Sequence, residues 1–309
     1  MERLLNLLCQ DSEIAVVGLH PRMMEGVNIA TFAHSHGVPV YESEAINGND
    51  YVQIVSELAT DLIISCNEKQ IFKPPLIKVP RVAVLNLHCG YLPLQRGGGG
   101  LYSAFINEQE AGVTVHYVNE QIDAGEIVAQ EHRPIGEHET IKDIQEWALQ
   151  IAPRMYVEAI HRVIDGSVIP VVQSGKYTYT PAMPEYDNMI DWSEPSALIH
   201  NRVRARQSPV WCFTFVEKRM LFVRSTQLLT DVADYIGPVG QVIARKANGV
   251  AVKTGNNALL VTSVAYENDQ PFIPAFGISS VFGINVVKEY FELTKRIALL
   301  EQAIEGRRR

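Results

Sequence analysis

The chain has 309 residues, of which 47% are hydrophobic and 20% charged. This length fits about two domains, and the composition excludes a disordered chain. Acidic residues outnumber basic ones by 35 to 27, and the formal net charge is −8. Proteins that hold a nucleic-acid backbone usually present a basic surface, so the charge argues against a nucleic-acid partner.

The cysteines and the hydropathy pattern indicate the cellular compartment in which the protein is expected. The four cysteines are at positions 9, 66, 89 and 212, and no C-x-x-C pair occurs. This spacing offers neither a zinc knuckle nor a redox pair, and free cysteines suit a reducing environment. No run of about 18 apolar residues occurs that would span a membrane. We therefore expect a cytoplasmic protein with no membrane partner.

Hydrophobic periodicity predicts an α/β domain in the first half of the chain. Short apolar runs predict strands, and longer runs with helical spacing predict helices. Strands that alternate with helices are typical of a doubly wound parallel sheet, a Rossmann-like fold. The predicted strands are Ile14–Gly18, Val38–Tyr41, Leu62–Ser65, Val82–His88 and Gly112–Val118, and the predicted helices are Met1–Gln10, Val27–His36 and Tyr51–Ala59.

A long helix is predicted to begin after Thr140. Thr140 and Asp143 fit the [ST]-x-x-[DE] capping pattern, and Gly166 follows the last apolar position. Pro153 lies in the middle of this segment and is expected to kink or split the helix.

The pattern changes near residue 172, and we predict three regions. Residues 1–172 form the catalytic domain, 173–204 a linker with a helix at Ser196–Arg204, and 205–309 an OB-like β-barrel with a terminal helix. That helix, Ile284–Gly306, could pack on its own barrel or on a second subunit, so a homodimer is one of two open arrangements. The predicted barrel strands are Cys212–Val216, Met220–Thr226, Gly240–Ala244, Val250–Thr254 and Leu259–Val264.

Polar side chains gather where the strand Val82–His88 ends. Side chains alternate along a strand, so Asn86 and His88 share one face and Leu87 takes the other. Ligands of open α/β sheets bind outside the carboxyl ends of the strands. An amide can stabilise an oxyanion, and an imidazole can carry a proton near neutral pH. The alternative is that both residues only cap the strand end.

Asp123 favours the catalytic interpretation. It follows the strand Gly112–Val118 in a D-x-G turn, and its carboxylate could reach His88. A carboxylate beside an imidazole holds its tautomer and stabilises its charged form. A locally satisfied Asx-turn is the alternative.

Four consecutive glycines, Gly97–Gly100, follow Arg96. No Gly-Lys-Ser/Thr follows them, which excludes a phosphate loop of the Walker type. We predict a flexible wall that lets a ligand approach the backbone, and a plain loop is the alternative.

The order N-x-H, L-P-x-x-R-G and D-x-G resembles the 10-formyltetrahydrofolate-dependent formyltransferases. The resemblance is clear over Ile14–Ile169, and 190–204 resembles the linker of the methionyl-tRNA and sugar N-formyltransferase branch. It implies that Asn86 binds the formyl oxygen, His88 lies beside the attacking amine, and Asp123 orients His88 and helps to move the proton.

The resemblance also assigns binding residues. It implies 10-formyltetrahydrofolate as co-substrate and requires no metal. The folate-contacting residues would be Gln70, Ile71 and Phe72, together with Gln121 and Ile122 in the loop beside the pterin. On the acceptor side we expect Arg96, Gly97, Gly98 and His116, although His116 could also be a satisfied polar group of its strand.

This sequence departs from the family pattern in places. Cys89 stands where the family usually has proline, and the chain begins inside what is usually the first helix. A first strand of the sheet is therefore expected to be missing, through a late start site or a truncated sheet, and mass spectrometry of the native protein would distinguish the two.

The acceptor is predicted to be a small amine, best a nucleotide-linked amino sugar. The tRNA enzymes of the family carry a long basic loop after the second strand, whereas His20–Val27 is short and contains Arg22 as its only Lys or Arg. Methionyl-tRNA is the second candidate, and the N-hydroxyornithine of siderophore assembly is a third.

Two other classes of function stay open from sequence alone. Cys89 beside His88 could be a hydrolase nucleophile, but strand alternation puts the two on opposite faces. The chain could also be a non-catalytic folate- or nucleotide-binding module, which the intact Asn86, His88 and Asp123 set disfavours.

Overall fold

The computed structural model describes residues 2–21, 29–181, 188–230, 234–267, 269–284 and 286–307. Contacts divide the chain into two compact units, Met1–Met183 and Pro184–Arg309. Part of the segment predicted as a linker, up to residue 181, therefore belongs to the first unit, and the described remainder belongs to the second.

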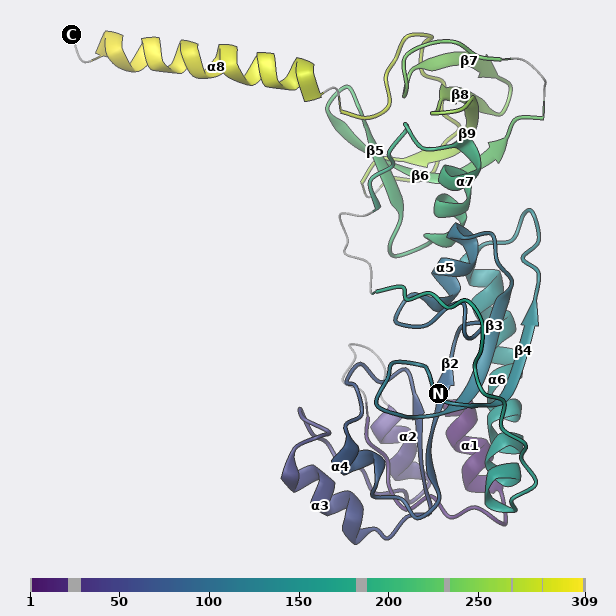
Figure 1. Ribbon diagram of the computed structural model, residues 1–309. Coiled ribbons are helices and arrows are strands. Elements are labelled where there is room, and N and C mark those ends of the chain that lie inside the picture. The colour runs from purple at the N-terminus through teal and green to yellow at the C-terminus, as the bar shows by residue number, and fades with distance from the viewer. Residues whose placement is uncertain are drawn as a thin grey trace. The chain divides into compact units, whose positions relative to one another are not determined.

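The described part of the first unit is built on a four-stranded sheet in the order β1-β2-β3-β4 (Figure 1). β1 and β2 are parallel, as predicted, whereas β3 is antiparallel to both β2 and β4. The α/β class is confirmed, with mixed strand directions. The strands are β1 (Leu62–Cys66), β2 (Ala83–His88), β3 (Ala111–Tyr117) and β4 (Ile127–Arg133).

Helices cover the sheet and bury its apolar residues. The main cluster joins leucines of the first helix, Leu85, Leu87, Val113 and Val115 of the sheet, and one face of the longest helix. The helices of this unit are α1 (Glu2–Gln10), α2 (Ile29–Ser35), α3 (Asn49–Glu57), α4 (Pro74–Ile77), α5 (Gly100–Ile106) and α6 (Ile141–Ile164).

Helix α6 anchors the strands beneath the site. Its predicted cap is present, since Asp143 Oδ2 accepts from both the backbone N and the Oγ1 of Thr140, at 2.7 Å each. Pro153 does not split the helix, because the buried face of α6 offsets the one hydrogen bond that proline removes. The fully buried Tyr156 hydroxyl donates to Leu85 O at 2.8 Å and accepts from Ser65 N at 3.1 Å, which ties β1 to β2.

Two strand predictions were wrong. Ile14–Gly18 and Val38–Tyr41 do not form strands, and their neighbourhood contains an isolated parallel bridge between Leu19 and Val40. Apolar runs of this length meet the local requirement for a strand, but pairing partners decide whether one forms. Strand β4 and the short helices α4 and α5 were not predicted.

The second unit is a small antiparallel barrel. Its described sheet has the order β5-β6-β9-β8-β7. Residues 279–283 connect the two edge strands: Phe282 bridges Val216 at the end of β5, and Val281 bridges Gln241 beside β7. This closure supports the OB-like barrel. The strands are β5 (Cys212–Val216), β6 (Arg219–Leu228), β7 (Val242–Lys246), β8 (Gly249–Lys253) and β9 (Ala258–Ala265).

Two helices complete the second unit. Helix α7 (Ser196–Ala205) packs Ile199 and Val203 into the barrel core together with Trp192 and Phe282. Much of the predicted linker therefore contributes to this core. The terminal helix α8 (Val286–Arg307) is one unbroken helix (Figure 1). No helix in the described ranges is long and apolar enough to cross a membrane.

Candidate active site

The site begins at the carboxyl end of β2, where β3 runs alongside. Asn86 pairs with His116 and His88 with Thr114 across the two antiparallel strands. Cross-strand partners lie on one face of a sheet, so Asn86 and His116 meet directly. Asn86 Nδ2 lies 3.1 Å from His116 Nε2. The register between β3 and β4 shifts at this point, since Val115 pairs with Ala129 and His116 with Ile127.

Asp123 reaches the site through a tight turn after β3. Its φ is +49°, a left-handed conformation that Asp tolerates better than most residues. Two residues on, Gly125 packs against Tyr117, and a Cβ there would lie 1.7 Å from Tyr117 O. The glycine of the D-x-G pattern is therefore required by close backbone contact, and it sets where Asp123 points.

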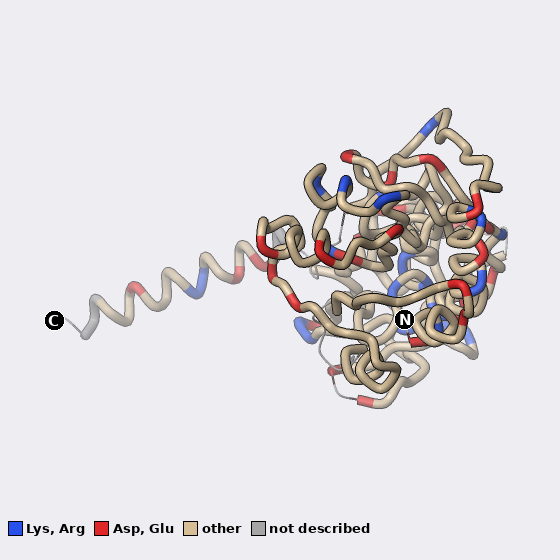
Figure 2. Tube along the Cα trace, turned by 90° about the horizontal axis from the view of Figure 1, so that it is seen from below, with Lys and Arg blue, Asp and Glu red and all other residues tan. Residues whose placement is uncertain are grey.

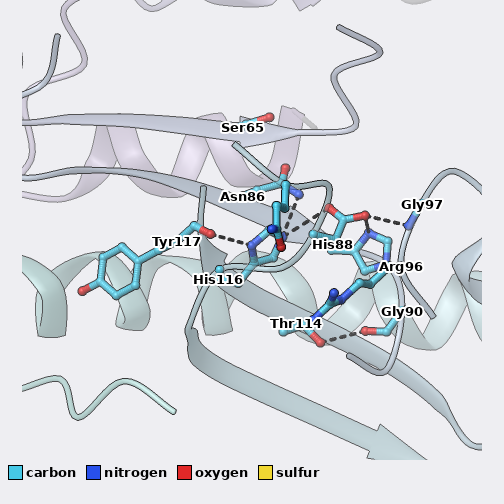
Figure 3. A network of polar contacts seen from close by, with 12 residues as sticks. Ser65, Asn86, His88, Gly90, Arg96, Gly97, Thr114, His116 and Tyr117 are labelled. Carbon is cyan, nitrogen blue, oxygen red and sulfur yellow. Dashed lines mark hydrogen bonds and ion pairs between the residues drawn. The ribbon is translucent and has the colours of Figure 1, made fainter. Parts of the chain in front are cut away.

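The Asp123 carboxylate lies between two imidazoles. Oδ2 is 3.6 Å from His88 Nδ1, and Oδ1 is 3.4 Å from His116 Nε2. Oδ2 also accepts a hydrogen bond from the Gly97 backbone N at 2.8 Å. Figure 3 shows Asn86, His88, His116 and Gly97 in this network. The predicted triad of Asn86, His88 and Asp123 thus comes together, with His116 as a fourth member.

Backbone carbonyls define the donor atoms of both histidines. His88 Nε2 lies 2.6 Å from Gln95 O, and His116 Nδ1 lies 2.8 Å from Tyr117 O. A carbonyl only accepts, so each of these nitrogens carries a proton. In the neutral rings, the lone pairs are then on His88 Nδ1 and His116 Nε2, the atoms that face Asp123. Protonation of His88 Nδ1 would create an ion pair with the carboxylate.

Burial and charge act in opposite directions on these groups. Burial lowers the pKa of His88 below its usual value, against the nearby charge of Asp123, which raises it. Burial alone would raise the pKa of Asp123, but the nearby His116 imidazole, the charge of His88 and the Gly97 amide lower this pKa to about 2. The site therefore holds an ionised carboxylate beside an imidazole that is neutral at physiological pH.

Arg96 is buried and contributes to the wall of the site. Its Nε and Nη2 donate to Gln173 Oε1 at 3.1 and 2.7 Å, and its guanidinium lies 4.7 Å from the ring centre of Tyr177. The guanidinium of Arg96 thus binds the chain itself in this structure, and its role toward substrate stays a prediction.

The glycine run is packed on one side by the chain itself. Thr180 N donates to Arg96 O at 2.9 Å, and Gly99 N donates to Thr180 O at 3.3 Å. A Cβ at Gly97 would lie 2.5 Å from Thr180 O, while Gly98 is exposed. Gly100 begins α5. Gly97–Gly100 were predicted to form a flexible wall that lets a ligand approach the backbone. In the structure, part of this close approach is taken by residues 178–181 of the chain itself.

The predicted folate residues follow β1, whose carboxyl end lies beside that of β2. Gln70 Oε1 accepts from Ile46 N at 3.3 Å, and Phe72 packs against the cluster around Ile46. Ile71 is 54% exposed, and Ile122 in the loop before Asp123 is 44% exposed. Gln121 is also exposed. Two apolar side chains thus stand open to solvent in the two segments assigned to folate.

Sequence reasoning missed two glutamines that hold the site in place. Gln95 is fully buried; its carbonyl fixes His88, and its side chain accepts from Tyr91 N at 2.8 Å. Gln173 Nε2 donates to the carbonyls of Asp123 at 2.9 Å and Gly125 at 2.7 Å. The position of Gln95 inside the L-P-x-x-R-G motif was an available signal, whereas Gln173 lies in a polar segment with no motif.

Cys89 does not join the network. It is exposed, and the protein around it raises the pKa of its thiol, which disfavours a thiolate nucleophile. His88 instead contacts Gln95 and Asp123. Over the described ranges, no group of three or more His, Cys, Asp or Glu is arranged to hold a metal ion.

An amide donor, an imidazole and a carboxylate at the strand ends of an α/β domain are the groups that an acyl-type transferase needs. Residues 7–160 match the family model described as formyl transferase, and residues 183–274 match the formyl transferase C-terminal domain. A methionyl-tRNA formyltransferase of Synechococcus sp. (strain JA-2-3B'a(2-13)) is 31% identical over 237 residues, covering 74% of this chain and 73% of that protein. The chain belongs to the formyl transferase family, and the prediction of an enzyme is confirmed.

Solved structures agree on the fold. WlaRD, a sugar 3N-formyl transferase determined with dTDP and 5-N-formyl-THF, superposes with a TM-score of 0.64 at 18% identity, covering 87% of this chain and 94% of that one. HypX from Aquifex aeolicus superposes with a TM-score of 0.54 at 19% identity and covers 77% of this chain. This chain spans 43% of the length of HypX.

Proposed function

We propose that this enzyme transfers the formyl group of 10-formyltetrahydrofolate to the primary amine of a nucleotide-linked amino sugar. The observation that carries the transfer chemistry is the convergence of Asn86, His88 and Asp123 on one face at the end of β2. The family membership supports the formyl donor, and the choice of acceptor rests on charge and on the acceptor-side wall.

Each member of the triad has a distinct part in the reaction. When the amine attacks the formyl carbon, the carbonyl oxygen becomes negative, and Asn86 Nδ2 can donate a hydrogen bond to it. The amine becomes positive and must lose a proton. His88 Nδ1 is the free base of the site, since His88 Nε2 is committed to Gln95 O. Asp123 stabilises the imidazolium that results. When the tetrahedral intermediate collapses, the bond between the formyl carbon and N10 of the folate breaks, the imidazolium returns the proton to N10, and tetrahydrofolate leaves.

His116 acts as a positioning residue. Its Nε2 accepts one N–H of Asn86, which leaves the second N–H of that amide for the oxyanion. Its Nδ1 is held by Tyr117 O, so the ring cannot turn without losing a buried hydrogen bond. His116 therefore fixes the direction of the amide.

The exposed side chains of Ile71 and Ile122 support a folate site. A pterin is flat and largely apolar on its faces, and burying two exposed isoleucines against it is favourable. Ile71 follows β1, whose carboxyl end lies beside that of β2, and Ile122 directly precedes Asp123 in the chain. Gln70, Phe72 and Gln121 complete the assigned folate residues.

Two observations favour a small nucleotide-linked acceptor. The net charge of −8 opposes a polyanionic tRNA, and Figure 2 shows Lys and Arg interspersed with Asp and Glu along the chain. Tyr177 and Tyr179 are 57% and 48% exposed beside Arg96, so they can stack on a planar base. Most of the short His20–Val27 loop, which also argued against tRNA, lies outside the described residues.

Methionyl-tRNA is the second candidate, and the names of the relatives favour it. Curated proteins between 25% and 31% identical to this chain carry the name methionyl-tRNA formyltransferase. A chain that resembles them in both domains could share their acceptor.

A direct acceptor assay decides between the two. The full-length enzyme is given 10-formyltetrahydrofolate with either a panel of nucleotide-linked amino sugars or methionyl-tRNA, and release of tetrahydrofolate is followed. We expect at least one amino sugar to exceed methionyl-tRNA in kcat/KM by about 100-fold or more. Transfer to methionyl-tRNA alone would overturn the sugar proposal, and transfer to neither would point to a different amine.

A further inference from the structure

The terminal helix α8 carries an exposed apolar face. Its described large apolar side chains are all more than half exposed: Tyr290, Phe291, Leu293, Ile297, Leu299, Leu300 and Ile304. The helix is tied to the barrel by an ion pair between Lys218 Nζ and Glu289 Oε2, 3.2 Å apart. An apolar surface of this extent on a polar helix is typical of a protein interface.

Most of these residues follow one seam. Starting at Val286, apolar residues recur after 4, 3, 4, 3 and 4 positions, at Tyr290, Leu293, Ile297, Leu300 and Ile304. This is the heptad spacing of a coiled coil, in which Tyr290, Ile297 and Ile304 occupy the a positions and Leu293 and Leu300 the d positions. Two of the a residues, Ile297 and Ile304, are β-branched. β-Branched residues at a with leucine at d favour a parallel coiled coil of two helices.

The charges that flank the seam fit the same arrangement. In this register Arg296 is a g position and Glu301 is the e position of the next heptad. In a parallel dimer each g residue faces the following e residue of the partner helix. Arg296 of one helix would therefore meet Glu301 of the other, twice by symmetry. In Figure 2 a basic stretch of α8 lies between acidic positions of the same helix.

We propose that α8 pairs with α8 of a second copy of this chain as a parallel two-stranded coiled coil, so that the enzyme is a homodimer. The 22-residue helix spans about 33 Å and offers just over three heptads. Arg296 and Glu301 carry opposite charges, are five residues apart and lie on opposite sides of the seam. This spacing matches a parallel pair of helices, whereas packing of α8 on its own barrel would not require it.

Two adjacent leucines provide a matched test. Leu300 lies in the seam and is 63% exposed, and Leu299 lies at a c position outside it and is 57% exposed. The mass of the full chain in solution is measured by light scattering at micromolar concentration. Wild type and Leu299→Glu should have twice the 34.5 kDa mass of one chain, and Leu300→Glu should have the mass of one chain with an unchanged Tm of the barrel.

The possible results distinguish a second copy of α8 from the chain's own barrel as the partner of this apolar face. A monomeric wild type would overturn the proposal and indicate that α8 packs on its own barrel, where Leu300→Glu would lower the Tm. A dimer that survives Leu300→Glu would place the interface elsewhere, and equal disruption by both variants would refute the seam.

Charge reversal tests the parallel orientation. Arg296→Glu alone brings two acidic residues together, and Glu301→Arg alone brings two basic ones together. Each variant should dimerise several-fold more weakly than wild type, and an equimolar mixture should form a heterodimer with restored affinity. A mixture no tighter than its components would overturn the parallel pairing.

Discussion

Replacing Asp123 with asparagine removes the charge at the centre of the site while keeping its shape. The Asn oxygen can still accept from Gly97 N, and its amide nitrogen takes the place of Oδ1, 3.4 Å from His116 Nε2. What is lost is the stabilisation of the imidazolium that His88 becomes when it takes the proton of the amine. The variant therefore isolates electrostatics from packing.

The size of the effect follows from the distance. His88 Nδ1 lies 3.6 Å from Asp123 Oδ2, and opposite unit charges about 4 Å apart interact by about 4 kcal/mol at an effective dielectric constant of 20. Lost from the transition state, this corresponds to a fall in kcat of about three orders of magnitude. The KM for the formyl donor should change little, because Asp123 acts on the proton rather than on folate.

The assay is steady-state formyl transfer as a function of pH, with Asp11→Asn as a matched control. Asp11 also pairs with a histidine, His161, at 2.8 Å, but lies outside the site. The charge of Asp123 raises the pKa of His88 against burial, so in Asp123→Asn the acid limb of the pH profile should move to lower pH. A kcat within tenfold of wild type, or an unmoved acid limb, would refute this account of Asp123.

Three further results are expected. In Gly125→Ala, the new Cβ would meet Tyr117 O at 1.7 Å, so the turn must shift; activity should fall more than the Tm, and an active variant would show that the turn tolerates displacement. Tyr156→Phe should lower the free energy of unfolding by about 1–3 kcal/mol in denaturant titrations, because the buried Ser65 amide loses its acceptor; a neutral change would mean that another group replaces it. The lowered pKa of His88 means that the unfolded chain binds more protons than the folded one just below pH 6.5, so its contribution to stability is lost as the pH falls through that window. His88→Gln should flatten this part of the pH–Tm curve, and identical curves would exclude His88 as its source.

More of the candidate site than of the sheet topology could be predicted from the sequence. Asn86 and His88 share a face because side chains alternate along any strand, and Asp123 follows in a turn whose glycine is visible in the sequence. These inferences depend on local geometry alone. The 3.1 Å contact between Asn86 and His116, however, depends on β3 running antiparallel to β2, and the 3.6 Å contact between His88 and Asp123 depends on the path of the turn after β3; strand patterns encode neither.

The missed features are those that depend on distant parts of the chain. Ile14–Gly18 has the composition of a strand but does not form one, since pairing requires a partner rather than a propensity. Pro153 breaks isolated helices, yet here packing against the sheet holds α6 together. Gln173 contacts Asp123 across 50 positions of sequence, a separation at which a lone polar residue gives no local signal.

The hydrogen bonds of Gln173 determine where the chain can be cut or joined to another protein without damage to the active site. A catalytic fragment cut at residue 172 would contain every member of the triad and still lack the side chain that holds the carbonyls of Asp123 and Gly125. It would also lose the segment that pairs with Arg96 and Gly99. A chimera that exchanges the barrel for that of a relative should therefore have its junction beyond Pro181. The catalytic domain then keeps the segment with Gln173 and Thr180 that contacts its own active site.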